Sequence, residues 1–338
     1  MVGESTSSSG SGSDRYGGHS VVSYYSRFAL AGGLCAAIPH AVLVPIDVVK
    51  TRMQLEGAQY KGMGDAFRDV LRTDGKRGLL LGLTPTLVGY FVQGMLKFGG
   101  FDFCKNQFIN IFGAENVYAH PLLTYMASSA IAETAATTLL TPFESLRIRM
   151  VAAPSEYRTS LGGVAAIQRA EGIMGFYRGL PPLLLKQLPY TITQLTVFSF
   201  VADAFYLRLI PSMFGYQRSE LSTHTQLGVS LVSGVVAGCT SSIVSHPADT
   251  ILTRIFMESK RQAAAMAAFK AGDQSAEAAA KARVSIGTVY EKIGFRGLWA
   301  GVGTRCIMVG ILSSLMFLIN DSTKVLVGLK TSAGLGAK

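Results

Sequence analysis

The side chains in this sequence with the clearest capacity for chemistry are ionisable groups set inside apolar stretches. His40 lies seven residues before Asp47, and Glu133 lies eleven residues before Glu144. Such spacings amount to about two and three turns of an α-helix, so each pair shares one helix face. A histidine or a buried carboxylate can take up a proton near neutral pH, as proton-coupled transport requires. A histidine bonded to a neighbouring backbone carbonyl is the alternative for His40.

Two further sets of polar residues recur at one-turn spacing within apolar stretches. A charged group in the hydrocarbon of a membrane costs ~2.5–3.5 kcal/mol on insertion scales, so such residues are candidates for function. Polar groups that follow one stripe of each helix can face a shared water-filled cavity in a helical bundle. The further residues predicted to line this cavity are Gln93 and Lys97, then Lys186, Tyr190 and Gln194.

The elements that must hold these side chains are long apolar segments. Hydrophobic residues make up 49% of the 338 positions and charged residues 15%, whereas a soluble domain has ~25% charged residues. A helix needs ~20 apolar residues to cross the hydrocarbon layer. We predict six membrane-spanning helices, because formal charges are absent between Arg27 and Asp47, Arg77 and Lys97, Lys186 and Asp203, Glu220 and Asp249, and Arg305 and Asp321, while residues 118–143 contain only Glu133.

One sequence pattern occurs three times along the chain. PIDVVKTRM begins at Pro45, PFESLRIRM at Pro142 and PADTILTRI at Pro247, at spacings of 97 and 105 residues. A second pattern follows each copy, first as DGKRGLLLG, then as EGIMGFYRG and IGFRGLWAG. Two landmarks that recur in the same order indicate three tandem structural repeats, each with two apolar helices.

Each repeat also contains a short amphipathic segment between its two spans. We predict helices over about residues 62–73, 160–170 and 284–292, which are too short to cross a membrane and should lie at its surface. Small residues in the odd-numbered spans, such as Gly32 and Gly33, allow helices to pack closely in lipid.

The repeats divide the chain into five parts. The Gly/Ser-rich residues 1–20 contain no apolar run and are predicted to be disordered. The third repeat is longer because of an Ala-rich, charged insertion, which either extends the fifth span as a helix or forms a loop. The remaining parts are repeat one at 21–115, repeat two at 116–215, repeat three at 216–330 with its insertion at 258–283, and a C-terminal tail at 331–338.

Composition and motifs argue against several functional classes. The net charge is +10, but the basic residues stand at segment ends and in loops without a nucleic-acid-binding motif, so an anionic membrane or solute fits better than nucleic acid. No nucleophile–base pair, metal-ligand cluster or phosphate-cradling glycine loop is visible, so we expect neither an enzyme nor a cofactor or metal. The four cysteines are isolated and are read as buried structural thiols: Cys35, Cys104, Cys239 and Cys306.

The repeated motif resembles the signature of the mitochondrial carrier family. The pattern Px[DE]xx[KR]x[RK] is complete in two copies and is broken in the third by Leu252. The resemblance extends over residues ~22–328. It implies an all-α membrane protein with six transmembrane helices in three tandem repeats and short surface helices on the matrix side. It also implies a multi-pass monomer of the mitochondrial inner membrane, with cardiolipin at the matrix-side helices, that works by alternating access.

The resemblance further implies a gate on the matrix side, made by the charges of the repeated motif. In the family these charges pair between odd-numbered helices and close the cavity. The residues involved here are Asp47, Lys50, Glu144, Arg147 and Asp249. The implied pairs are Asp47 with Arg147 and Asp249 with Lys50, whereas Glu144 faces Leu252 and has no partner.

A second gate on the cytosolic side is implied by the motif [FY][DE]xx[KR] of the even-numbered helices. The first copy holds Asp102 and Lys105, the segment FSFVA at Phe198 holds no charge, and the third copy holds Asp321 and Lys324. Only Lys105 and Asp321 are expected to pair. A gate of one ion pair would open more easily than a gate of three.

Several runs resemble the phosphate carriers of this family in particular. These runs are GYFVQGMLKFGGFD, AETAATTLLTPFE, KQLPYT and HAVLVPIDVVKTRMQ. The resemblance implies transport of inorganic phosphate with a proton, or in exchange for hydroxide. It ties that transport to His40, Thr51, Gln93, Lys97, Glu133, Glu144 and Lys186.

One position departs from the phosphate carriers. They commonly have a lysine where this chain has Gln194, and a neutral amide cannot supply the charge that a phosphate attracts. Lys97, Lys186 and Arg305 are cations that could compensate. Two alternatives therefore stay open, namely a carrier for another anion such as a dicarboxylate, and a membrane subunit that does not transport.

Overall fold

The computed structural model describes residues 20–332, apart from 57–59, 61, 155–156, 158, 218–219, 271–285 and 300–301. Over the described part the chain forms helices and no strand, which confirms the predicted all-α class. Three long helices with an internal proline provide the odd-numbered spans. They are α1 (Val21–Glu56), α7 (Pro121–Ala152) and α12 (Thr223–Lys270).

The even-numbered spans are built differently, because two of them contain a π-helical turn. The second span runs through α4 (Leu83–Gly94), a π-helix η3 (Met95–Gly99) and α5 (Gly100–Phe112). The fourth span is α10 (Leu180–Ala204), continued by the π-helix η4 (Phe205–Leu209) and α11 (Ile210–Phe214). The sixth span is α15 (Val302–Leu326).

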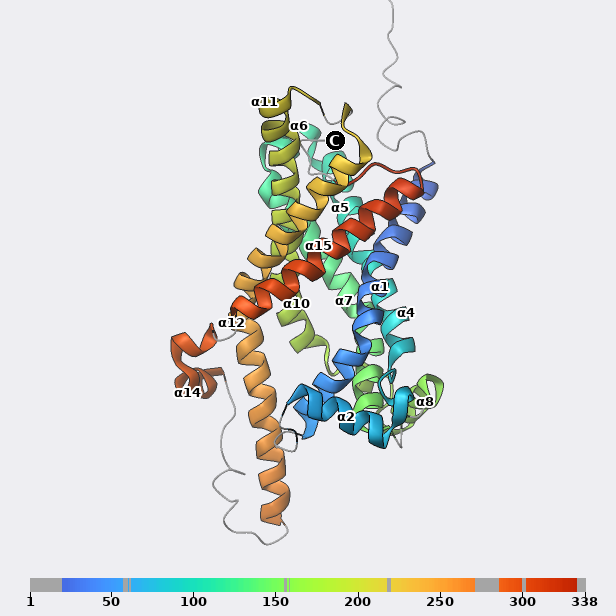
Figure 1. The fold of residues 1–338 in the computed structure, drawn as a ribbon, viewed down its shortest axis with the longest axis vertical. Coiled ribbons are helices and arrows are strands. Elements are labelled where there is room, and N and C mark those ends of the chain that lie inside the picture. Colours follow the sequence, from blue (N-terminus) through green and yellow to red (C-terminus); the bar gives the residue numbers. More distant parts are fainter. Residues whose placement is uncertain are drawn as a thin grey trace, which may run out of the picture.

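Short helices complete each repeat. They are α2 (Met63–Thr73) and α3 (Gly75–Gly78), then α6 (Ala114–Ala119), α8 (Ser160–Glu171) and α9 (Met174–Tyr177), and finally α14 (Ile286–Leu298). Figure 1 shows α2, α8 and α14 at one end of the bundle, here called the surface-helix end. The start of α1 and the last turns of α15 lie at the opposite end, here called the terminal end.

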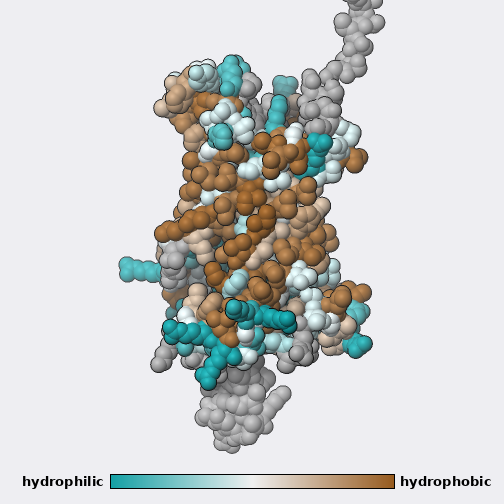
Figure 2. All heavy atoms as spheres, turned by 45° about the vertical axis from the view of Figure 1, so that its right-hand side comes forward, coloured by the Kyte–Doolittle hydropathy of each residue, from teal (hydrophilic) through white to brown (hydrophobic). Residues whose placement is uncertain are grey.

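The outer surface of the bundle matches a membrane environment. In the view of Figure 2, apolar side chains form a band around the middle of the molecule, and polar residues gather towards both ends. Large apolar side chains in the spans are exposed, as at Val42 (72%) and Ile307 (68%). Within the described residues, five continuous helical stretches are long and apolar enough to cross a membrane.

The sixth membrane helix is α7, whose composition is more polar than that of the others. Its 32 residues give a length of about 48 Å, more than the ~30 Å of hydrocarbon. Glu133 and a series of threonines and serines lower its hydropathy, and most of them are buried against neighbouring helices. α7 packs against α4 and α10 within the bundle.

The sequence repeat corresponds to a repeated local structure. The glycines Gly75, Gly172 and Gly294 adopt φ values of 67°, 66° and 63°, which residues with a side chain rarely adopt. Each glycine follows a surface-helix segment and turns the chain towards the next span. Their spacings of 97 and 122 residues equal those of the second sequence landmark.

An arginine at the end of the odd-numbered span anchors the surface helix in the first two repeats. Arg52 pairs with Asp74 at 2.6 Å, and Arg149 pairs with Glu171 through Nη1–Oε1 at 2.5 Å and Nη2–Oε2 at 3.1 Å. The hydrogen bonds from Arg149 hold the pKa of the half-buried Glu171 carboxyl below its usual range. In the third repeat the residue before the glycine is Ile293, so this carboxylate is missing.

The predicted surface helices agree with the structure, since α2, α8 and α14 overlap all three predicted segments. The insertion at 258–283 continues α12 as a helix as far as Lys270. Its residues 271–283 lie outside the described residues, as do residues 1–19 of the N-terminal tail and 333–338 of the C-terminal tail.

The first and second spans approach each other at two glycines. A Cβ atom added to Gly94 would lie 2.1 Å from the Gly32 carbonyl oxygen, and one added to Gly32 would lie 2.5 Å from that of Gly94. Both contacts are with backbone, so a side chain could be accommodated only by moving a helix. This contact places η3, and therefore Lys97, against α1.

We expect Gly94→Ala to destabilise the folded protein by about 1–3 kcal/mol, the range for overpacking a close helix contact. Thermal unfolding in detergent measures this effect. The matched control is Gly64→Ala in α2, where an added Cβ meets no atom within 4 Å. The control should be neutral or slightly stabilising, because alanine favours a helix over glycine. Equal stability of the two variants would contradict the importance of the close contact.

Candidate solute site

The centre of the site is Lys97, which lies in the π-helical turn η3 of the second span. Its side chain is buried, with 5% exposure. The ammonium donates hydrogen bonds to Thr191 Oγ1 at 3.0 Å and to Gln194 Oε1 at 2.8 Å, both from α10. It also lies 5.4 Å from the centre of the Tyr190 ring. A buried cation held by neutral groups can bind an anion that replaces those groups.

The amide of Gln194 connects three even-numbered spans. Its oxygen accepts from Lys97, while its Nε2 donates to Ser313 Oγ of α15 at 2.7 Å and to the Tyr190 hydroxyl at 3.1 Å. A lysine here could not accept a hydrogen bond from Lys97, and it would bring two ammonium groups together. A glutamine at position 194 is therefore compatible with the hydrogen bond that Lys97 donates to it.

Glu133 supplies a carboxylate to the same region from α7. Its Oε1 accepts from Thr137 at 2.6 Å and from Gln93 at 3.3 Å. Its Oε2 is buried without a hydrogen-bond partner in the described part of the chain, and the residue has 0% exposure. Glu133 also acts electrostatically on Lys97. A buried carboxyl group with one unsatisfied oxygen is a candidate for binding a proton.

A second polar cluster lies nearer the surface-helix end. Asp249 of α12 pairs with Lys186 of α10 at 3.4 Å and with the guanidinium of Arg305 of α15. Arg305 also donates to Ser245 at 3.2 Å. The predicted pair between Asp249 and Lys50 is not formed in this conformation. Lys186 and Arg305 hold Asp249 instead, because they lie on α10 and α15, which pack directly against α12. Lys50 is exposed and makes no ion pair with a described residue.

Arg147 forms a third cluster between the first two repeats. Its guanidinium lies 3.0 Å from Asp47 of α1 and 3.0 Å from Glu144, one turn earlier on α7. The contact expected between Asp47 and Arg147 is therefore present. Glu144 was expected to lack a partner and instead bonds with Arg147, since an (i, i+3) spacing brings the two side chains together. The side chain of Leu252 lies outside the described residues.

Two predicted residues lie apart from the central group. His40 places Nδ1 2.8 Å from the Ala36 carbonyl oxygen, and its ring stacks on Tyr90 with centroids 3.7 Å apart. This is the bonded histidine that the sequence left open as an alternative. Thr51 is half-buried on α1, eleven residues or about 16 Å along the helix from His40.

Towards the terminal end of the bundle, aromatic rings join the three even-numbered spans. Phe198 of α10 stacks on Phe317 of α15 at 3.7 Å, and Phe98 of η3 meets Phe317 edge-on at 5.7 Å. These three rings join the even-numbered spans next to the hydrogen bonds of Gln194. The second copy of the cytosolic motif, FSFVA in α10, has no charged residue, and it contributes the ring of Phe198 to this contact.

The predicted pair between Lys105 and Asp321 is also wrong for this conformation. Lys105 lies 3.4 Å from Asp102, and Lys324 lies 3.8 Å from Asp321, each pair within one helix. Asp321 bonds with Ser230 of α12 and with Ser332, so its carboxylate is already occupied. The Lys324 ammonium lies 3.8 Å from the centre of the Phe28 ring.

Burial differs between the two ends of the bundle. At the surface-helix end, the Asp47 side chain is 31% exposed and that of Lys186 is 44% exposed. At the terminal end, Lys324 is 2% and Asp321 is 0% exposed. The central group with Lys97 is thus enclosed on the terminal side, while the charges towards the surface-helix end are partly open.

The sequence did not single out several residues of the central group. Thr137 lies one turn after Glu133, a spacing that could have identified it. Thr191 is adjacent to Tyr190 and could have been found in the same way. Ser313 had no local signal, because its role depends on α15 packing against α10.

Comparisons with known proteins agree with this architecture. A family model described as "Mitochondrial carrier protein" matches residues 22–112, 118–208 and 223–331. The "Phosphate carrier protein, mitochondrial" of Caenorhabditis elegans is 37% identical over 90% of this chain and 82% of its own length. The "Mitochondrial substrate carrier family protein N" of Dictyostelium discoideum is 39% identical, covering 91% and 96%. The human "Solute carrier family 25 member 3" is 35% identical, covering 89% and 76%.

Proposed function

Because this chain belongs to the mitochondrial carrier family and is a multi-pass protein of the mitochondrial inner membrane, we propose that it imports inorganic phosphate together with a proton. Relatives that are named mitochondrial phosphate carriers share 31–37% of its residues over about nine tenths of its length. The surface-helix end then faces the matrix, and the terminal end faces the cytosol.

This proposal rests on Lys97 and Glu133, two side chains of opposite charge that are both buried at the centre of the bundle. Lys97 is a buried cation whose partners are neutral, so a phosphate oxygen can replace Thr191 or Gln194 at its ammonium. The hydroxyl groups of Tyr190 and Ser313 lie beside the same amide. They offer further hydrogen bonds to a phosphate bound at this place.

Glu133 is proposed to carry the proton. Its unpartnered Oε2 can be protonated without breaking the bonds that Oε1 receives from Thr137 and Gln93. Protonation would remove a negative charge near an entering phosphate anion. Binding of the anion and of the proton would then favour each other, which is the basis of symport.

We expect the central site to open alternately to the two sides, because the two ends of the bundle are closed by different contacts. In the described conformation the aromatic rings and the even-numbered spans close the cytosolic side. On the matrix side, motif charges pair between repeats through Asp47 with Arg147 and Asp249 with Lys186, but Asp47 and Lys186 remain 31% and 44% exposed. The opposite conformation would separate the even-numbered spans, and it would let Asp249 leave Lys186 and Arg305 for Lys50.

A substrate test distinguishes phosphate from other anions. The purified protein is reconstituted in liposomes with an alkaline interior, and uptake of labelled phosphate is measured with excess unlabelled phosphate, malate or sulfate outside. We expect uptake that unlabelled phosphate suppresses and malate does not. We also expect Gln194→Lys to reduce uptake, because it places a second ammonium beside Lys97. Uptake suppressed equally by malate would indicate a dicarboxylate carrier. No uptake of labelled phosphate, or of labelled malate in a parallel assay, would support a subunit that does not transport.

A further inference from the structure

The chain does not leave the bundle at the end of α15 but turns back into it. Gly328 has φ 78°, and its N–H bonds to the Val325 carbonyl at 3.1 Å. The N–H of Leu329 bonds to the Lys324 carbonyl at 2.7 Å. This pair of bonds around a left-handed glycine is the Schellman motif, which ends a helix and reverses the chain. The residues that follow are therefore directed over the terminal end.

This returning segment, Val327–Ser332, is attached to two other helices. Arg27 of α1 donates to the Val327 carbonyl at 2.5 Å, and Thr331 donates to Gln226 of α12 at 2.7 Å. Leu329 is 8% exposed and belongs to the apolar core at this end. In Figure 1 the chain after α15 runs from beside the start of α1 back over the end of the bundle. The segment thus connects the first repeat with the third.

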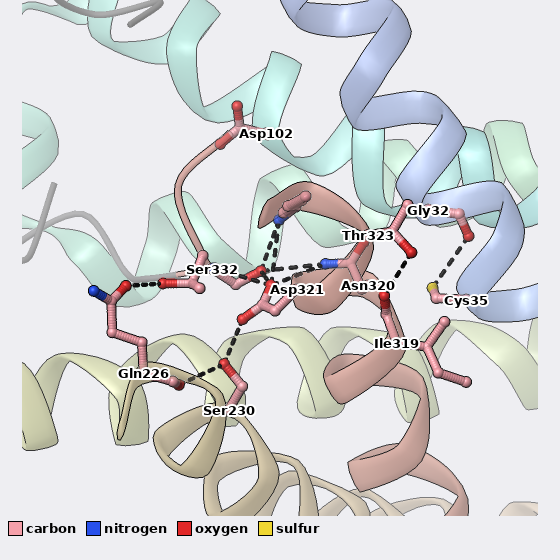
Figure 3. Close-up of polar contacts among 12 residues, drawn as sticks. Gly32, Cys35, Asp102, Gln226, Ser230, Ile319, Asn320, Asp321, Thr323 and Ser332 are labelled. Atoms are coloured by element: carbon pink, nitrogen blue, oxygen red, sulfur yellow. Dashed lines mark hydrogen bonds and ion pairs between the residues drawn. The ribbon is translucent and has the colours of Figure 1, made fainter. Parts of the chain in front are cut away.

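Ser332 reaches the charged residues at the inner side of α15 (Figure 3). Its backbone N–H bonds to Asp321 Oδ1 at 2.9 Å, and its hydroxyl bonds to the same oxygen at 2.5 Å. The same hydroxyl accepts from Lys324 Nζ at 2.7 Å. In Figure 3, Ser332 and Ser230 lie on two sides of Asp321. The segment therefore occupies the position at which an ion pair with another repeat was expected.

We propose that Val327–Ser332 is a latch that holds the cytosolic end closed and must detach each time that end opens. The proposal rests on the alternating access proposed above. Separating the first repeat from the third at this end would either break the bond between Arg27 and Val327 or pull the segment away from Asp321 and Gln226. Among the described residues, Lys105 pairs with Asp102 and Lys324 pairs with Asp321 within their own helices, and the latch adds a contact between the first and third repeats.

The accessibility of Cys35 provides a direct test. Cys35 is 0% exposed on α1, and Figure 3 shows it beside Gly32, close to the end of α15. The protein, with alanine at its three other cysteines, is placed in lipid nanodiscs and reacted with a charged maleimide. We expect the double variant Thr331→Val with Ser332→Ala to be labelled at least about tenfold faster, because it removes three hydrogen bonds and the loss of one bond to a charged group already corresponds to about tenfold. Ser212→Ala, an exposed serine that bonds only within its own helix turn, is the matched control.

A second variant guards against simple misfolding. Arg27→Met removes the bond to the Val327 carbonyl from the other side of the segment and should also accelerate labelling, while melting temperatures measured in parallel show that both variants remain folded. Unchanged labelling in both folded variants would overturn the latch. The labelling needs no phosphate, so faster labelling without any phosphate uptake would preserve the latch and reject the proposed substrate.

Discussion

Replacing Lys97 by glutamine is expected to reduce labelled phosphate uptake by a factor on the order of a hundred. The loss of one partner from a buried, hydrogen-bonded charge interaction costs about 2–5 kcal/mol, and about 2.7 kcal/mol corresponds to a hundredfold change. Glutamine has a similar length and can still bond with Thr191, so the fold should persist. Initial rates of uptake into liposomes with an alkaline interior measure the effect.

Lys76→Gln is the matched control for this prediction. Lys76 is an exposed lysine in the short helix α3, so its replacement should leave uptake within about twofold of the unmodified protein. If Lys97→Gln transports as fast as this control, the phosphate does not bind at the buried ammonium. Phosphate binding would then be assigned to the cluster that contains Lys186 and Arg305.

Replacing Glu133 by glutamine is expected to separate phosphate movement from proton movement. The amide keeps the size of the carboxyl group but cannot exchange a proton near neutral pH. Uptake driven by a pH gradient should fall by a factor on the order of ten to a hundred, since proton transfer by one group typically contributes this much or more. Exchange of internal for external phosphate without a pH gradient should fall much less.

The control for this second prediction is Glu115→Gln, an exposed carboxylate in α6. It should retain both the driven uptake and the exchange. Equal losses of uptake and exchange in Glu133→Gln would indicate that Glu133 holds the site together rather than carrying the proton. In that case His40 would become the stronger candidate for proton transfer.

The three-repeat fold could be predicted from the sequence because its determinants are local and recur. The motif prolines, the landmark glycines and the apolar segments mark the same points in each repeat. Gly75, Gly172 and Gly294 show this most clearly, since all three take the same unusual backbone conformation. The equivalent arginine anchors, Arg52 and Arg149, also follow from the repeat.

The pairing of charges was harder to predict, because it depends on which helices are neighbours in one conformation. Asp249 was assigned to Lys50 from the resemblance to the carrier family, but Lys186 and Arg305 lie on helices that pack against α12 and hold Asp249 in this conformation. Sequence spacing alone cannot rank three cations around one carboxylate. The (i, i+3) partner of Glu144 was visible in the sequence, and Arg147 bonds with Glu144 while it also pairs with Asp47 of the first repeat.

The C-terminal residues were the least predictable part of the candidate gate. Residues 331–338 read as a polar tail, yet Thr331 and Ser332 are bonded within the bundle. Their hydroxyl groups have no periodicity, and their partners lie 105 and 11 residues away in the sequence. Only Gly328, placed just after an apolar helix, signals that the chain turns back there.

The most direct test of the proposed symport is the pH inside phosphate-free proteoliposomes that contain a trapped pH-sensitive dye. With no initial pH difference, addition of external phosphate should acidify the interior as each phosphate enters with a proton. The acidification should be strongly reduced in Glu133→Gln and should persist in Glu115→Gln. Accumulation of labelled phosphate without acidification in the unmodified protein would contradict coupling between phosphate and protons.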